Sequence, residues 1–96
     1  MDEQNIESQF ELLKGVKVSL NKVTPRRLKE LQALGVDVYS EPSLLSNNIY
    51  KVYKDDDPFK RFMNAIFDKE FSDDEILDVD MEEVNRGFLD FVTRAR

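Results

Sequence analysis

Histidine, cysteine and tryptophan are all absent from this 96-residue sequence. Histidine is the usual general base near neutral pH, cysteine supplies the usual thiolate nucleophile, and the two are the commonest ligands of zinc. Their absence excludes most thiol, zinc and triad chemistry. No motif assembles carboxylates, lysine, tyrosine or serine into a recognisable catalytic site. We therefore expect a protein that is not an enzyme and requires no cofactor.

Long apolar segments are also missing, since no run approaches the roughly 20 apolar residues that a membrane-spanning helix needs. The chain begins MDEQNIESQ, which is polar and acidic, whereas a secretory signal would be basic and then apolar. The lack of cysteine agrees with a reducing compartment. We expect a cytoplasmic protein with no membrane partner, and a frayed polar segment at residues 1–8.

Positive charge is in the minority, because 14 basic and 20 acidic residues give a net charge of −6. Such a charge disfavours binding to nucleic acids and anionic membranes. The two signs are also separated: residues 14–29 contain six basic residues and no acid, whereas residues 68–83 contain nine acids and a single lysine. Two interpretations stay open. Either the charges form solvated faces of amphipathic elements, or they pair within one subunit or between subunits, which would make the protein a homo-oligomer.

The apolar content is about two fifths of the residues, which suffices for one modest core and a single domain over residues 1–96. Apolar and polar residues alternate in residues 10–20 on either side of Gly15, which predicts a β-hairpin. A helix is the alternative, because Ile6, Phe10 and Leu13 have helical spacing. Gly15 fits poorly inside a helix, so we favour the hairpin.

Helix signals follow the hairpin. Thr24 and Pro25 predict a helix start, and Gly35 predicts its end. Residues 37–57 are ambiguous between a loop with a short helical turn and a loop with a strand. After Pro58 an apolar stripe with helical spacing predicts another helix; its members are Phe59, Phe62, Met63, Ile66, Phe67 and Phe71.

Two capping boxes follow, Ser72 with Glu75 and Asp80 with Glu83, and each predicts the start of a helix. Gly87 lies within the inward stripe of the last helix, which predicts a close helix–helix crossing there. The fold class expected from all these signals is α+β and predominantly helical, with a small N-terminal β-hairpin followed by about four helices.

The acids at positions 78, 80 and 82 copy the first three ligand positions of an EF-hand loop. The match fails where calcium binding needs it, because Glu83 replaces the glycine of the turn and Leu89 replaces the bidentate glutamate. We expect no metal site. A DNA-binding helix-turn-helix is not expected either, because Pro42 stands where the second helix should be.

The aromatic stripes are first of all core residues, but a chain of this size has a small interior, so some aromatic side chains could be shared with a partner. We therefore predict partner or self contacts on the apolar faces and between opposite charges. The predicted contact residues are Phe59, Phe62, Phe88 and Phe91, together with Arg26 and Arg27 against Asp73 and Asp74.

Two segments, VKVSLNKVTPRRLKELQALGVDVYSE and FSDDEILDVDMEEVNRGFLDFV, together make up about half of the chain and resemble the tail assembly chaperones of long-tailed bacteriophages. The first has a short strand before a helix that starts with Thr-Pro and ends with Leu-Gly-Val-Asp. The second has an Asp-x-Asp-x-Glu-Glu start before an aromatic-rich helix. The resemblance implies a small non-enzymatic protein of the infected cell's cytoplasm that binds the tape-measure protein and recruits tail-tube subunits. The alternative function is an acidic inhibitor whose residues 68–83 mimic DNA and block a nucleic-acid-handling enzyme.

Overall fold

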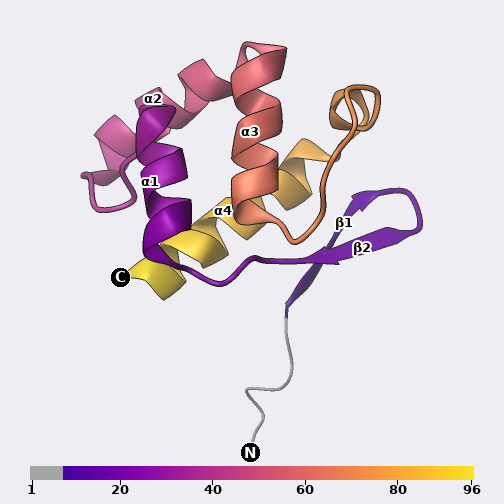
Figure 1. Ribbon diagram of the computed structural model, residues 1–96, viewed down its shortest axis with the longest axis horizontal. Helices are drawn as coiled ribbons and strands as arrows, with labels where there is room; N and C mark the ends of the chain where they lie inside the picture. Colours follow the sequence, from indigo (N-terminus) through magenta and orange to yellow (C-terminus); the bar gives the residue numbers. More distant parts are fainter. Residues whose placement is uncertain (1–7) are drawn as a thin grey trace, which may run out of the picture.

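A computed structural model describes residues 8–96 of the chain. An N-terminal β-hairpin is followed by four α-helices, with a short 3-10 helix before the last one (Figure 1). The elements are β1 (Gln9–Leu13), β2 (Val16–Ser19), α1 (Pro25–Ala33), α2 (Pro42–Tyr53), α3 (Asp56–Ile66), η2 (Glu75–Leu77) and α4 (Met81–Ala95). The predicted α+β, predominantly helical fold class is confirmed. The predicted fraying of residues 1–8 falls almost entirely outside the described residues.

The hairpin packs one face of its two antiparallel strands onto the start of α4. Phe10 and Val18 are paired across the strands and both are buried, and Gly15 adopts a φ of 77° in the connecting turn. The backbone N–H of Asp80 donates to the carbonyl oxygen of Leu12 at 2.8 Å. This bond fixes the start of α4 against β1.

Helix α1 has the boundaries that its sequence predicts. The Thr24 hydroxyl oxygen accepts from the backbone N–H of Arg27 at 3.3 Å, and Pro25 is the first helical residue. Gly35 follows the helix with a φ of 88°, and the N–H of Val36 returns to the carbonyl oxygen of Leu31. The backbone groups at both ends of this helix therefore have the partners that a capped helix requires.

The ambiguous segment 37–57 contains a regular helix of 12 residues, α2. Pro42 opens this helix, at a position where a missing N–H costs nothing. Its buried residues Leu45, Ile49 and Val52 follow helical spacing. A loop with one short turn or a strand was the wrong prediction, because the run Ser46-Asn47-Asn48 lowers helix propensity while packing against α3 stabilises the helix.

Only one of the two predicted capping boxes forms. Ser72 and Glu75 exchange both reciprocal bonds, at 3.0 and 3.2 Å, but they open a 3-10 turn of three residues. Asp80 instead caps α4 by accepting from the N–H of Glu82. The carboxylate of Glu83 accepts from the N–H of Glu11 in β1 and pairs with Arg86. The Glu83 side chain, which was expected to cap its own helix, therefore connects α4 to the hairpin.

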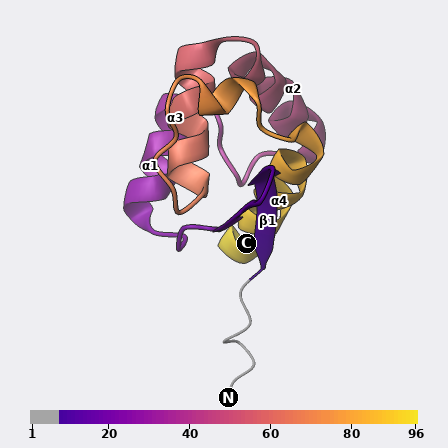
Figure 2. The same ribbon diagram turned by 90° about the vertical axis from the view of Figure 1, so that its right-hand side faces the viewer.

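The buried apolar side chains of all these elements form one cluster. Helix α3 lies at its centre and contacts α1, α2, α4 and η2 (Figures 1 and 2). Within residues 8–96, no helix combines the length and the apolar character that spanning a membrane would require.

The C-terminal end of α3 is capped from a distance by Asn21. Its side-chain Nδ2 donates to the carbonyl oxygens of Asn64, Ala65 and Phe67 at 3.0 to 3.1 Å, and its backbone N–H donates to that of Ile66 at 2.7 Å. The last carbonyl groups of a helix have no partners within it. A single residue, Asn21, therefore donates to four successive carbonyl groups at the end of the central helix.

Replacing Asn21 with alanine should lower the free energy of unfolding by about 2 kcal/mol, because partly buried carbonyl groups lose their donor. The measurement is urea unfolding followed by circular dichroism. Asn47→Ala, on the exposed face of α2, is the matched control and should change stability by no more than about 0.5 kcal/mol. Equal effects of the two substitutions would contradict the distant cap.

Gly87 permits a close approach, but the approaching group is an aromatic ring. A Cβ atom on Gly87 would lie 2.4 Å from the Phe67 ring and 3.6 Å from a methyl carbon of Leu20. The predicted helix–helix crossing is therefore corrected to the insertion of a phenylalanine side chain against the backbone of α4. The ring itself stands at the end of α3 that Asn21 caps.

Gly87→Ala should destabilise the protein by about 1–3 kcal/mol, because the rigid ring must move. Helix propensity alone predicts the opposite effect, an increase of about 1 kcal/mol in the free energy of unfolding, because alanine favours a helix more than glycine does. A double-mutant cycle with Phe67→Leu tests the cause: Gly87→Ala should cost less in the Phe67→Leu variant than in the parent. An unchanged cost in both backgrounds would show that the ring is not responsible.

Candidate protein-binding surface

The four phenylalanines that the sequence marks as contact residues belong to the interior. The exposed fractions are 7% for Phe59, 5% for Phe88 and 0% for Phe62 and Phe91. The rings of Phe62 and Phe88 lie 5.4 Å apart between centroids, and Phe59 stacks on Phe62. Because Phe59, Phe62 and Phe91 are covered by their own chain, the prediction that they offer an apolar face to a partner is wrong for this fold. Phe88 differs, because its side chain also lines a groove between two helices.

The four charged residues predicted to pair are not brought together within one chain. Arg26 is exposed, and Arg27 pairs with Glu30 of its own helix at 3.1 Å. Asp73 pairs with Lys60 of α3 at 2.8 Å. Helix α1 lies on one side of α3 and the η2 turn lies on the other (Figure 1). Pairing of these residues between subunits stays a prediction.

Seven large apolar side chains remain exposed among residues 8–96, and they mark the candidate surfaces for binding another protein. They are Val16, Tyr39, Leu44, Tyr50, Leu77, Met81 and Leu89. Tyr39 precedes α2, Leu44 and Tyr50 lie on α2, and Leu89 lies in the middle of α4. The other three lie at the hairpin turn (Val16), in η2 (Leu77) and at the first residue of α4 (Met81). Exposed apolar groups that gather on one face are typical of interaction sites.

A groove separates α2 from α4, which lie one above the other (Figure 2). Its volume is about 370 Å³. The lining consists of Pro42, Leu45, Ser46 and Ile49 from α2 and Asn85, Phe88 and Leu89 from α4. The side chain of Leu89 is 63% exposed at its edge. We call this feature the α2–α4 groove.

Helical spacing decides which exposed residues of α2 lie beside the groove. Tyr50 follows Ser46 by one helical turn, so it extends the groove side of the helix. Leu44 comes one residue before the inward-facing Leu45 and points away from the groove side. Both residues are exposed. Tyr50 therefore lies beside the groove and Leu44 lies away from it, and neither residue is part of the lining.

One hydrogen bond links the two walls of the groove. The Tyr53 hydroxyl on α2 donates to Oδ1 of Asn85 on α4 at 2.9 Å. The Tyr53 ring stands edge-on against Phe59 and Phe62. Burial raises the pKa of Tyr53 to about 12. With its oxygen occupied, the Asn85 amide keeps its N–H groups as donors at the rim of a mainly apolar groove.

The raised pKa of Tyr53 predicts a loss of stability at high pH. The unfolded chain releases the proton near pH 10 and the folded chain near pH 12, so the contribution of neutral Tyr53 is complete below pH 10 and disappears between pH 10 and 12. Urea midpoints at about pH 9 and about pH 11 should differ more for the parent than for Tyr53→Phe. An identical difference in both proteins would contradict the assignment.

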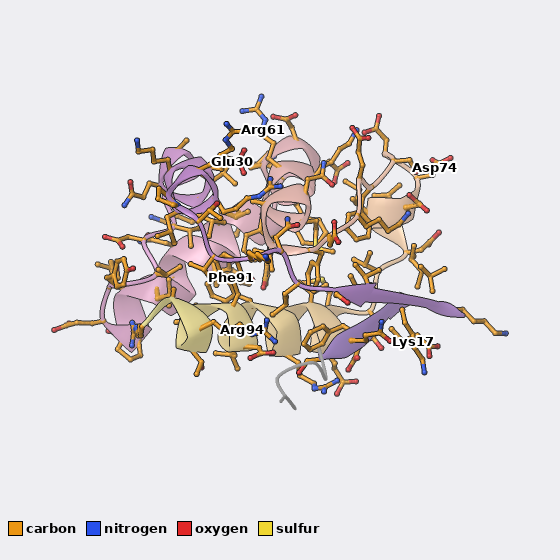
Figure 3. All side chains as sticks on the ribbon, turned by 60° about the horizontal axis from the view of Figure 1, so that its bottom comes forward. Lys17, Glu30, Arg61, Asp74, Phe91 and Arg94 are labelled. Atoms are coloured by element: carbon orange, nitrogen blue, oxygen red, sulfur yellow. The ribbon has the colours of Figure 1, made fainter. Side chains whose placement is uncertain are left out.

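A second hollow, between α1 and α3, is lined by charged groups that already have partners. Its volume is about 310 Å³, and Arg27, Glu30 and Arg61 lie along it. Glu30 and Arg61 are seen side by side in Figure 3. Arg27 pairs with Glu30 across one turn of α1, and Arg61 pairs with Asp57 at 3.3 Å. The hollow is therefore a weaker candidate than the apolar groove.

The chain matches no protein-family model, no curated protein and no solved structure. Within residues 8–96, no three acids gather as they would around a metal ion. The apolar groove is thus the feature from which a function can be inferred. Sequence reasoning named one of its lining residues, Phe88, but missed the groove itself. A further signal was present, because Leu89 is an apolar residue outside the inward stripe of its helix.

Proposed function

We propose that this chain is a non-enzymatic protein-binding protein that holds an amphipathic helix of its partner in the α2–α4 groove. The observation that supports this is an apolar channel between two helices with an exposed leucine at its edge. A groove of this kind suits the apolar face of a third helix, whose side chains insert at helical spacing. Each partner leucine that becomes fully buried would contribute about 1.5–3 kcal/mol.

The polar groups of the groove would set how the partner helix lies. Leu45, Ile49 and Phe88 provide an apolar floor, whereas Ser46 and Asn85 are the polar members of the lining. The amide of Asn85 is oriented by its bond to Tyr53. A partner helix with one acceptor side chain among its apolar residues would satisfy this amide, and such a polar contact would fix the orientation of the partner.

The resemblance to phage tail assembly chaperones suggests which partner to test. We propose the tape-measure protein as the ligand of the groove, with tail-tube subunits recruited to the complex, in the cytoplasm of the infected cell. A long partner rich in amphipathic helix would present many segments suited to such a groove, and covering them would keep it soluble.

The acidic inhibitor is the weaker alternative. Several acids of residues 68–83 are neutralised within the chain, since Asp73 pairs with Lys60, Glu75 with Lys69 and Glu83 with Arg86. The charge available to a basic partner is therefore smaller than the sequence alone indicates. We place the binding function in the groove for this reason.

The test of the proposed function replaces the exposed leucine of the groove with a charge. Leu89→Lys should reduce co-purification with a co-expressed tape-measure protein by at least about tenfold, because binding of the partner helix would bury a charge at the edge of the groove. Leu44→Lys is the matched control, since it changes another leucine that is more than half exposed, on α2 outside the groove. It should retain binding within about twofold.

Thermal unfolding of both variants should stay close to that of the parent, because both leucines are more than half exposed. Tape-measure solubility is the second readout and should fall only with Leu89→Lys. Equal capture by both variants, or a tape-measure protein whose solubility is indifferent to the chain, would overturn the proposed role of the groove.

A further inference from the structure

The end of the molecule opposite α1 carries a second exposed apolar surface. The hairpin turn and the η2 segment lie together at this end of the long axis (Figure 1), and Figure 2 looks onto it. Val16 in the hairpin, Leu77 in η2 and Met81 at the start of α4 are its exposed apolar residues. The 2.8 Å bond from Asp80 to Leu12 holds the start of α4 against the hairpin.

Charges of both signs flank these apolar residues. Lys14 and Lys17 lie at the hairpin turn, and Asp74 and Asp78 lie on either side of Leu77; all four are exposed. Lys17 and Asp74 are labelled at the same end in Figure 3. None of the four takes part in an ion pair with another residue of 8–96. We call the three apolar and four charged residues the end face.

We propose that the end face is an interface between two copies of this chain, related by a two-fold axis. With the axis between the hairpin turn and η2, Leu77 and Met81 of one copy would be set against Val16 of the other. The lysines of each hairpin turn would face Asp74 and Asp78 of the other copy. Because the end face carries both positive and negative charges, a two-fold rotation brings lysines against aspartates at two equivalent places in the dimer.

The position of the charges also selects a closed dimer over an open chain. Basic and acidic patches at opposite ends would join copies head to tail and produce filaments or rings. Here both patches share one end, so the contact is self-complementary and stops at two copies. Arg26 and Lys29 of the basic segment lie on α1 and take no part in it.

The size of the end face limits the strength of the dimer. The molecule measures 31 by 22 Å across its long axis, so a contact that uses only part of this end would be smaller than the ~800 Å² per partner of a standard interface. Much of its specificity would come from charge, which salt screens. The dimer should therefore depend on protein concentration and weaken as ionic strength rises.

The test is sedimentation velocity of the full chain from about 5 to about 500 µM, a range that brackets the affinity expected for a small interface. The parent should move from the mass of one chain, 11.3 kDa, towards twice that mass. Raising the salt from about 0.05 to about 0.5 M should shift the transition to higher concentration. A monomer throughout, or a mass that keeps growing beyond two copies, would overturn the proposal.

Two charge-reversal variants test the geometry. Lys14→Glu with Lys17→Glu gives a wholly acidic end face, and Asp74→Lys with Asp78→Lys gives a wholly basic one. Each variant alone should dimerise at least about tenfold more weakly, because like charges meet. An equimolar mixture of the two should recover the parent's dimer, since both contacts then join opposite signs.

Reversal of Arg26 and Lys29 to glutamate is the matched control, because it changes the same net charge on α1 and should leave the dimer unaffected. Failure of the mixture to recover the dimer would overturn the charge contact. Leu89→Lys should dimerise like the parent. The end face and the groove can therefore fail separately, and loss of tape-measure binding leaves this inference standing.

Discussion

The side chain of Asn21 at the end of α3 is the contact on which the rest of the fold depends. The central helix touches every other helix, so its last turn must be buried, and buried carbonyl groups need donors. Asn21 provides these donors from the segment after β2. In addition, the backbone N–H of Asp68 donates to the carbonyl oxygen of Ser19, the last residue of β2, at 2.8 Å. These bonds tie the hairpin to the helices. The ring of Phe67 is thereby fixed where only a glycine in α4 can face it.

The aromatic residues follow from this constraint. A chain of 96 residues buries a smaller share of its surface than a large domain, so a few large side chains must fill the core. Phenylalanines from the hairpin, α3 and α4 meet around the capped end and the centre of α3. With most of the phenylalanine rings inside, the large apolar side chains left exposed are valine, leucine, methionine and tyrosine. Of the four phenylalanines predicted as contacts, Phe88 lines the groove and the other three fill the core.

Local signals in the sequence predicted the elements that local chemistry determines. The hairpin turn at Gly15 and the Thr24 cap involve residues within a few positions of each other, and both were predicted. Helix α2 was missed because its stability comes from packing against α3, which outweighs the poor propensity of Ser46-Asn47-Asn48. The partners of Asn21 lie more than 40 positions away, and Glu83 likewise bonds to a distant strand. No local pattern contains such information. The groove needs two helices in place before Leu89 can be recognised as its edge.

The two proposed surfaces have a joint consequence, because they lie on different parts of the molecule. The end face uses the hairpin turn, η2 and the first residue of α4, whereas the groove uses α2 from Pro42 to Ile49 and the middle of α4. A dimer formed through the end face would leave both grooves open. Once one groove holds a helix of a long partner, the second groove meets the next segment of the same chain at a high effective concentration. Two weak sites would then bind a long helical protein tightly, while a short helix would dissociate readily. Selection by length follows from the placement of the surfaces, without any need for a strong individual contact.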